Sequence, residues 1–351
     1  MGNELTTKLR IRGWNELKKI IIAVSTFLLI GLLSACTQNG KEANTNSEDQ
    51  TVKIGYFPNL THIATIVALE NQYFNEEFGE NVNIETKTVS NGGLFMEAMT
   101  TKAIDVGTVG PGPLLNFYVK NPKFHIISGA VNGGAVLVAN EGSGIEKLSD
   151  LDGKRVAIPV IGSTQDVMLR KALKEVNLNT TTNGGTVELF AAAPADTATL
   201  FVQNSVDAAA TQEPWGYFLE TQANGKLLLN WDQFAWGKES TNTVVAVTNE
   251  FLENKELVQA YLNAHKKAVA FIQDNPEKAQ ELVIKHIKDL TGKEINKEET
   301  AAAFSRLQVT TNVNEQVIQE MADISKEAGY IPSNNIDGLI NLSHLQNLGK
   351  Q

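Results

Sequence analysis

The sequence predicts an α/β protein built from two lobes of the same kind. Short apolar segments alternate with segments of helical period from residue 51 to residue 247. One pattern occurs twice in the sequence: an expected helix, a short run that contains an aspartate, and then a proline that opens another helix. The run and the proline are 103–106 and Pro111 in the first copy, and 205–208 and Pro214 in the second. Beyond residue 247 the pattern is almost wholly helical. Short loops between alternating strands and helices favour a mainly parallel sheet in each lobe, with the late helices packed on lobes already built.

The first series of elements begins after residue 50. Expected strands cover 52–56, the alternating segment 82–89 and the apolar segment 104–109. Expected helices cover 62–73, where Ile63, Ile66, Val67 and Leu69 have helical spacing, and 94–101, after the break at Asn91, Gly92 and Gly93. The run 110–113 reads GPGP, and a new helix should start there, because proline suits the first turn of a helix.

The second series repeats this order. Expected strands cover 155–159, 187–190 and 206–210, and expected helices cover 166–176 and 197–203. Later helices are expected over 257–273, 276–288, 299–306 and 315–328. Segments 135–139 and 244–247 are the strands best placed to cross between lobes. The first lobe would then comprise 51–138 and 244–351 with the C-terminal helices, and the second lobe would be the insertion 139–243.

The N-terminus has the features of an export signal. Residues 1–35 carry five basic and two acidic side chains, against a formal net charge of −10 for the whole chain. The uncharged run 20–33 is too short to span a bilayer and follows the basic segment, as in a signal peptide. Leu33, Ser34, Ala35 and Cys36 resemble the bacterial lipobox, which implies that Cys36 is lipidated. The alternatives are a chance cysteine after an ordinary cleavage site and a short anchor that is never cut.

The polar run 36–50 cannot bury a core, so we expect a flexible tether between the lipid anchor and the folded body. Cys36 is the single cysteine, which excludes an intramolecular disulfide and a cysteine-rich metal site. The acidic balance argues against nucleic acid as a partner. The five histidines lie far apart, and the GxxxxGK[ST], HExxH and GxSxG patterns are absent from the sequence. We therefore expect neither catalytic residues nor a bound metal or cofactor.

Loops that follow expected strands and open expected helices form the candidate site. In open α/β sheets ligands bind beyond the ends of such strands, and helix starts offer N–H groups and a partial positive charge that suit an anion. The candidate ligand-binding residues are Tyr56, Asn59, Thr61, His62, Asn91, Gly92, Gly93, Gly110, Pro111, Gly162, Ser163, Thr164, Gln165, Asp196, Glu213 and Trp215.

Each of these loops also has a purely structural interpretation, because Ser, Thr, Asp, Asn and Pro cap helices. Trp215 is either a core aromatic or a wall of the site, and His62 is either a cap residue or a ligand donor. Glu213 either leads a helix or faces the cleft, where it would select a ligand with a cationic or donor group. Asp105 and Asp207 are expected to be structural, at turns that lead into strands.

Several segments resemble the solute-binding proteins of nitrate, sulfonate, taurine and bicarbonate ABC importers. They are 54–62 (IGYFPNLTH), 104–113 (IDVGTVGPGP), 148–157 (LSDLDGKRVA), 162–164 (GST), and 206–208 followed by 213–215 (VDA…EPW). The resemblance implies a two-lobed periplasmic-binding-protein fold of the second type, with a ligand cleft between the lobes. It also implies a monomer that is lipid-anchored on the extracytoplasmic face and delivers a small anion to an ABC permease and its ATPase.

The identity of the ligand stays open at this point. An aliphatic sulfonate or taurine-like anion is favoured, because the matching loops hold no arginine and Tyr56, Phe57, Trp215 and Trp236 suit an organic ligand. The alternatives are nitrate, bicarbonate and a thiamine-precursor pyrimidine. A surface sensor on the same fold, or a pyrimidine-synthase-like enzyme, would be a protein of another class. That enzyme family uses a cysteine-rich motif, which a lone cysteine in the lipobox does not match.

Overall fold

The computed structural model describes residues 50–292 and 295–348. The expected signal peptide, Cys36 and nearly all of the tether lie outside these described residues. The chain divides into two units, Met1–Glu48 and Asp49–Gln351, and the two sheets and the pocket belong to the second unit. Among the described residues, no helix has both the length and the apolar composition that crossing a membrane requires.

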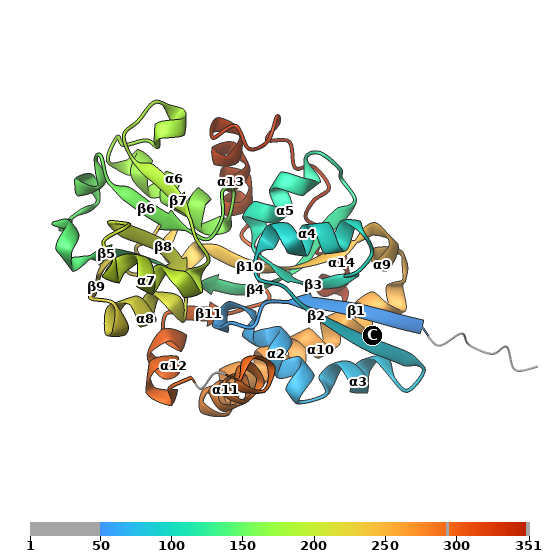
Figure 1. Ribbon diagram of the computed structural model, residues 1–351. Coiled ribbons are helices and arrows are strands. Elements are labelled where there is room, and N and C mark those ends of the chain that lie inside the picture. Colours follow the sequence, from blue (N-terminus) through green and yellow to red (C-terminus); the bar gives the residue numbers. More distant parts are fainter. Residues whose placement is uncertain (1–49, 293–294, 349–351) are drawn as a thin grey trace, which may run out of the picture. The chain divides into compact units, whose positions relative to one another are not determined.

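The second unit contains two mixed sheets, each of which forms one lobe (Figure 1). The first lobe has strand order β11-β4-β10-β3-β1-β2 and the second has β7-β6-β8-β5-β9. The strands of the first lobe are β1 (Gln50–Tyr56), β2 (Val82–Thr88), β3 (Val106–Val109), β4 (Phe124–Gly133), β10 (Thr241–Thr248) and β11 (Leu307–Val309). Those of the second lobe are β5 (Ala135–Asn140), β6 (Arg155–Ile158), β7 (Glu188–Ala191), β8 (Ala208–Gln212) and β9 (Gly225–Leu229).

The two lobes repeat one topology, as the sequence repeat predicts. In each lobe, three strands run parallel (β2-β1-β3 and β7-β6-β8), and the next strand of the sheet runs antiparallel to them. That strand is β10 in the first lobe and β5 in the second, and each directly follows a crossing between the lobes. The carboxylate of Asp105 accepts the backbone N–H of Lys53 at 2.9 Å, and that of Asp207 accepts the N–H of Arg155 at 2.8 Å. Both aspartates therefore tie the third strand of their lobe to the first, which confirms their structural role.

Both sheets are mixed, as expected, but the expectation that they are mainly parallel is wrong. Four described strand pairs are parallel and five are antiparallel, because a strand that returns from the other lobe reverses its direction. Strands β4, β9 and β11 were not expected from the sequence. In β4 the polar residues His125, Ser128 and Asn132, together with glycines, interrupt the apolar alternation.

The chain crosses between lobes in turns rather than within strands. Strand β5 belongs wholly to the second sheet, so the first crossing lies at Gly133–Gly134, before the expected boundary at residue 138. Both glycines have positive φ, +68° and +69°, a conformation that other residues rarely adopt. A Cβ on Gly133 would lie 2.2 Å from the ring of Trp231, which belongs to the second crossing, 230–240. The two crossings therefore pack directly on each other.

Helices cover both faces of each sheet. They are α2 (Ile63–Glu70), α3 (Tyr73–Phe78), α4 (Gly92–Thr100), α5 (Pro111–Tyr118), α6 (Thr164–Glu175), α7 (Thr197–Val202), α8 (Trp215–Gln222), α9 (Asn249–Glu253), α10 (Lys255–Asp274), α11 (Pro276–Thr291), α12 (Lys297–Phe304), α13 (Glu315–Glu327) and α14 (Ser343–Asn347). Helices α2, α3, α10 and α11 pack on one face of the first sheet, and α4 and α5 on the other. In the second lobe α6 covers one face, while α7 and α8 cover the other.

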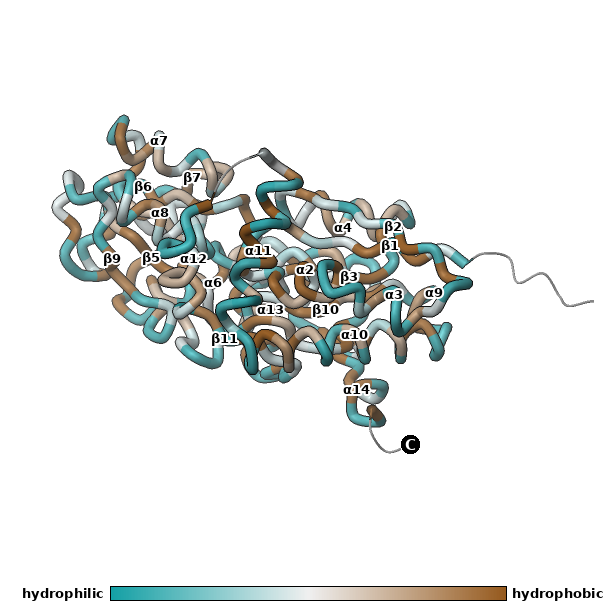
Figure 2. The backbone as a smooth tube through the Cα atoms, turned by 90° about the horizontal axis from the view of Figure 1, so that it is seen from below, coloured by the Kyte–Doolittle hydropathy of each residue, from teal (hydrophilic) through white to brown (hydrophobic). Residues whose placement is uncertain are grey.

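One helix differs in an informative way from the sequence expectation. Instead of running over 62–73, α2 ends at Glu70 and a separate helix, α3, begins at Tyr73, because Gln72 between them adopts the left-handed conformation with φ of +58°. Surface helices such as α11 alternate hydrophilic and hydrophobic residues along their length (Figure 2), as one-sided burial requires.

Helix α13 contributes to the core that both lobes share. Its residues Val317, Ile318, Met321 and Ala322 are buried in one hydrophobic cluster with side chains from both sheets. Full burial of a side chain of the size of Val, Ile or Met stabilises the fold by about 1.5–3 kcal/mol. The helix packs on α5 of the first lobe and on α6 of the second.

Candidate functional site

A small pocket lies where the two lobes meet. It encloses about 450 Å³ of empty space, part of which is open to solvent. Its lining residues are all uncharged or, in the case of histidine, neutral: Phe57, Thr61, His62, Ser90, Asn91, Gly92, Gly110, Pro113, Pro159, Val160, Ser163, Thr164, Gln165, Gln212, Asn242 and Thr243. The pocket therefore offers hydroxyl, amide and backbone N–H groups rather than full charges.

Helix starts from both lobes converge on this pocket. The side chain of Asn59 accepts the N–H of Thr61 before α2, and the side chain of Asn91 caps α4 by accepting the N–H of Leu94. Gly110 precedes α5, and the hydroxyl of Ser163 caps α6 by accepting an N–H of its first turn. The first N–H groups of a helix have no partner inside that helix and carry a partial positive charge. This arrangement favours a negatively charged or strongly accepting ligand group.

His62 lines the pocket as a neutral ring. Its Nδ1 lies 2.8 Å from the hydroxyl of Thr108, which in turn lies 3.0 Å from the hydroxyl of Thr65. The ring of Phe57 covers it at 4.3 Å between centroids. Complete burial lowers the pKa of His62 to about 3, because the charged form would lose its hydration. The histidine can therefore donate or accept a hydrogen bond but offers an anion no full positive charge at neutral pH.

The lobes contact each other directly beside the pocket. The N–H of Gly112 in α5 donates to the hydroxyl of Thr164 in α6 at 3.2 Å, and the amide of Asn116 donates to the carbonyl of Gly162 at 3.0 Å. The amide of Gln165 donates to the side-chain oxygen of Asn242 at 3.1 Å. These bonds join the two lobes across the cleft, so the structure represents a closed arrangement.

A second, more apolar chamber adjoins the pocket. It encloses about 820 Å³ of empty space, part of it open solvent, and shares Phe57, Ser90 and Gln212 with the first pocket. The remaining lining residues are Pro58, Asn59, Thr88, Val89, Ala193, Pro194, Ala195 and Trp215. Trp215 thus lines this chamber and is not part of the hydrophobic core, and its place in a ligand site stays a prediction. The two chambers together suit a ligand that has a polar group at one end and an apolar substituent at the other.

Several candidate residues lie elsewhere. The hydroxyl of Tyr56 is bound to Nε2 of His286 at 2.7 Å, so Tyr56 lines neither chamber. It occupies the opposite face of its strand from the cleft. Asp196 is exposed outside both chambers, and Gly93, Pro111 and Gly162 adjoin lining residues without lining the pocket. Gly162 supports the site indirectly through its carbonyl bond to Asn116.

Glu213 does not face the cleft, and the hypothesis that it selects a cationic ligand group is not supported. Its carboxylate is fully buried, accepts the N–H of Tyr217 at 2.9 Å and pairs with Arg306 at 3.0 Å. Burial raises the pKa of Glu213 to about 7 in spite of the neighbouring guanidinium. Arg306 precedes β11 of the first lobe, so this ion pair also joins the lobes.

Sequence reasoning missed part of the pocket. Pro159 ends an expected strand and Val160 follows it, and Ser90 and Gln212 are direct neighbours of candidate residues. Taking more residues on each side of every loop would have included these four. Asn242 and Thr243 had no such signal, because β10 begins earlier than expected and contributes its first residues to the site. The described residues contain no group of three His, Cys, Asp or Glu side chains that could hold a metal ion.

Comparisons with known proteins agree with this geometry. The alkanesulfonate-binding protein SsuA of Xanthomonas axonopodis pv. citri, solved with bound MOPS, superposes with a TM-score of 0.70 at 19% identity, covering 84% of this chain and 99% of its own. The nitrate-binding protein NrtA of Synechocystis PCC 6803 gives a TM-score of 0.69 at 14% identity, with 86% and 89% coverage. A Bacillus subtilis (strain 168) protein, provisionally named an aliphatic sulfonates-binding protein, is 27% identical over 79% of this chain and 80% of its own.

These likenesses confirm the expected two-lobed periplasmic-binding-protein fold. They also bear out the resemblance to sulfonate- and nitrate-binding proteins that the sequence motifs suggest. The model of the NMT1-like family matches residues 45–286, which include both sheets except β11. The chain belongs to the NMT1-like family.

Proposed function

We propose that this protein is the solute-binding component of an ABC importer and captures a small organic anion between its lobes. An aliphatic sulfonate or taurine-like ligand is favoured. The observation that carries the proposal is the uncharged pocket at the lobe interface, lined by helix starts, hydroxyls and amides and continuous with an apolar chamber. The protein would then deliver its ligand to a permease and its ATPase at the extracytoplasmic face of the membrane.

The chemistry of the inner pocket suits a monoanion. Helix starts and hydroxyls such as those of Ser163 and Thr164 stabilise an anion without a full countercharge. The lining residues include no carboxylate to repel it and no lysine or arginine to balance a second negative charge. A sulfonate group is a monoanion at every physiological pH and presents three acceptor oxygens to such donors.

The apolar chamber favours an organic ligand over an inorganic ion. Nitrate and bicarbonate have no extension that would displace water from the space between Phe57 and Trp215. An alkyl or ring substituent would bury apolar surface there and gain roughly 25 cal/mol for each Å² removed from water. A pyrimidine could also stack on these aromatic side chains, so the pyrimidine alternative is tested together with the sulfonates.

A thermal-shift series tests the ligand class. We expect ethanesulfonate or taurine to raise the melting temperature of the unit Asp49–Gln351, and nitrate, bicarbonate and an aminopyrimidine to leave it unchanged. Ligand at 100 times its Kd adds about 2.7 kcal/mol, which for a unit of this size corresponds to a shift of roughly 4 °C. Failure of the whole panel to shift the transition would contradict the proposal. A shift with nitrate alone would retain solute binding but overturn the assignment to organic anions.

A growth experiment distinguishes a transport component from a surface sensor. A transport component is required for growth when the ligand identified by the series is the sole source of its nutrient element, whereas a sensor is not. Formation of a product from that ligand by the purified protein would instead support an enzyme.

Membrane attachment through Cys36 is a separate part of the proposal. We expect Cys36→Ala to move the mature protein from the membrane fraction to the soluble fraction, because two acyl chains anchor a protein stably and their attachment point would be lost. The neighbouring change Ser34→Ala keeps the cysteine and is the matched control, which should remain with the membranes. Membrane retention of the Cys36→Ala variant would show that another feature anchors the chain.

A further inference from the structure

The segment between β11 and α14 connects the two lobes on one side of the cleft. We refer to residues 310–340 as the C-terminal strap. It leaves the first sheet at β11 and places α13 between α5 and α6 (Figure 1). It then returns to the first lobe, where the carbonyl of Leu339 accepts the N–H of Ile126 at 2.8 Å and the carbonyl of Asp337 accepts the hydroxyl of Tyr118 at 2.6 Å. Both ends of the strap are therefore fixed to the first lobe.

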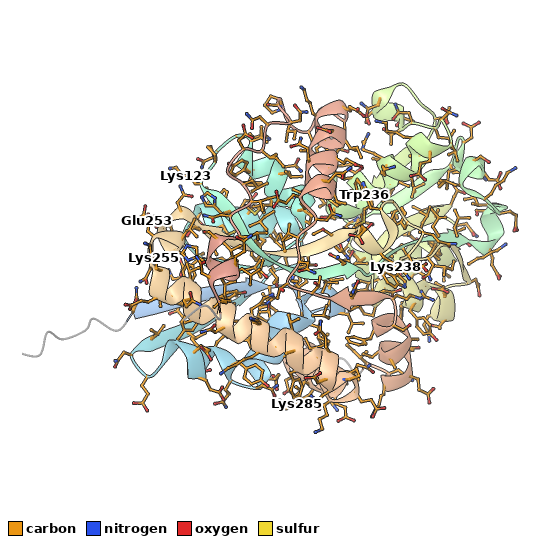
Figure 3. All side chains as sticks on the ribbon, turned by 180° about the vertical axis from the view of Figure 1, so that it is seen from behind. Lys123, Trp236, Lys238, Glu253, Lys255 and Lys285 are labelled. Carbon is orange, nitrogen blue, oxygen red and sulfur yellow. The ribbon has the colours of Figure 1, made fainter. Side chains whose placement is uncertain are left out.

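The strap is also fixed to the second crossing between the lobes. The indole of Trp236 lies beside α13 and donates to Glu320 at 2.6 Å (Figure 3). The amide of Asn314 donates to Glu239, in the same crossing, at 3.0 Å. Because the crossing and both ends hold it, the strap should move with the first lobe when the cleft opens.

One strap residue, Tyr330, reaches into a buried polar cluster of the second lobe. Its hydroxyl donates to Oδ2 of Asp166 at 2.5 Å and accepts from Nη2 of Arg170 at 2.6 Å. The guanidinium of Arg170 also lies over the tyrosine ring, 4.9 Å from its centroid. Asp166 is fully buried and Arg170 is 6% exposed, so water cannot readily replace the tyrosine as a partner.

The same carboxylate holds the pocket loop of the second lobe. Oδ2 of Asp166 accepts the N–H of Gly162 at 2.7 Å, and the N–H of Asp166 donates to the hydroxyl of Ser163 at 3.3 Å. Oδ1 of Asp166 is occupied by Nε of Arg170 at 2.9 Å. Ser163 and Thr164 line the pocket. The oxygen atom that holds this loop, Oδ2 of Asp166, is therefore the same atom that accepts the hydrogen bond from the Tyr330 hydroxyl.

We propose that Tyr330 is a positioning residue of the ligand pocket. From the first lobe, its hydroxyl orients the Asp166 carboxylate and so fixes the loop of Gly162, Ser163 and Thr164 in the second lobe. The inference rests on the proposed function in that it takes this pocket as the ligand site. When the lobes separate, Tyr330 leaves Asp166, and the loop loses part of its support. The pocket is then fully shaped only in the closed arrangement, which links ligand affinity to closure without any contact between Tyr330 and the ligand.

The variant Tyr330→Phe tests this role in the full chain, extracted in a non-ionic detergent. Phenylalanine keeps the ring over Arg170 and removes only the hydroxyl. We expect amide hydrogen exchange in segment 161–166 to quicken at least fivefold in the closed protein, saturated with ethanesulfonate, while exchange in the body of α6 stays unchanged. The control Lys174→Met removes another strap contact, the exposed pair with Glu327 at 2.6 Å, which does not touch Asp166. It should leave segment 161–166 as in the parent.

Affinity provides the second measurement. With ethanesulfonate as the probe, we expect Tyr330→Phe to raise Kd at least tenfold and Lys174→Met to leave it unchanged. Unchanged exchange in segment 161–166, or equal acceleration across all of α6, would overturn the positioning role. If the parent chain itself does not bind ethanesulfonate, the sulfonate assignment fails. The exchange measurement is then made with the member of the thermal-shift panel that does bind, and it still decides the role of Tyr330.

Discussion

Replacing Gly112 with alanine is expected to abolish tight ligand binding while the protein stays folded. A Cβ at this position would lie 2.8 Å from the backbone nitrogen of Thr164, 2.9 Å from the carbonyl carbon of Ser163 and 3.1 Å from the carbonyl oxygen of Gly162. These are backbone atoms of the opposite lobe and cannot rotate away. Gly112 is in α5, and alanine is a better helix former than glycine. The substitution should therefore not destabilise the first lobe itself.

The added methyl group would act as a wedge that keeps the lobes apart. We expect Kd for the best ligand of the panel to rise at least 100-fold, which corresponds to about 2.7 kcal/mol, with little change in the melting temperature of the unliganded protein. Isothermal titration and thermal unfolding measure the two quantities. Gly93→Ala is the matched control, since its Cβ would meet only Asn91 of its own lobe, at 3.3 Å. Parent-like affinity in Gly112→Ala would mean that binding does not need this closed interface.

The second large effect is expected from Arg306→Met, which leaves a buried carboxylate without its cation. Glu213 is fully buried, and Arg306 is its cationic partner at 3.0 Å. The same guanidinium also contacts Glu220 and lies over the ring of Tyr217, 5.3 Å from its centroid. Removal of one partner of a buried ion pair typically costs about 3–5 kcal/mol. We expect a loss of this size in the free energy of unfolding at pH 8, measured by urea denaturation.

The same variant should show a characteristic pH dependence. Burial raises the pKa of Glu213 to about 7 in the folded protein, above its ordinary value of 4.5. A group of this kind contributes stability that is fully present below its unfolded pKa and is lost as the pH rises through its folded pKa. Without Arg306 the folded pKa rises further. The destabilisation should therefore be small at pH 5.5, where Glu213 is protonated in both proteins, and large at pH 8.

A surface ion pair provides the control for this measurement. Lys297→Met breaks a pair with Glu281 at 2.7 Å, in which both side chains are more than half exposed. Exposed pairs contribute about 0–1 kcal/mol, so this variant should differ little from the parent at either pH. The pair of Lys285 with Asp289 on the surface of α11 (Figure 3) is of the same exposed kind. An Arg306→Met effect of equal size at pH 5.5 and pH 8 would contradict the role given to Glu213.

Local sequence patterns were sufficient to predict most helices and strands of the fold. Apolar spacing located the long C-terminal helices, and the repeated aspartates Asp105 and Asp207 revealed that both lobes have one design. Where the pattern was interrupted, prediction failed, as in β4 with its glycines and buried polar residues. That strand is stabilised by β10 and β11, which lie far along the chain and leave no trace in the local sequence.

For the candidate site, the sequence alone determined where helices begin. Caps such as Asn91 and Ser163 act on N–H groups within three residues of themselves, so their signal is local and readable. Only the tertiary structure decided which caps share a pocket, and that Tyr56 and Glu213 lie outside it. Their partners, His286 and Arg306, are 230 and 93 residues away. The physical reason is that periodicity and capping depend on neighbours within one helical turn, whereas closure of the lobes depends on contacts that the chain makes only after both sheets have formed.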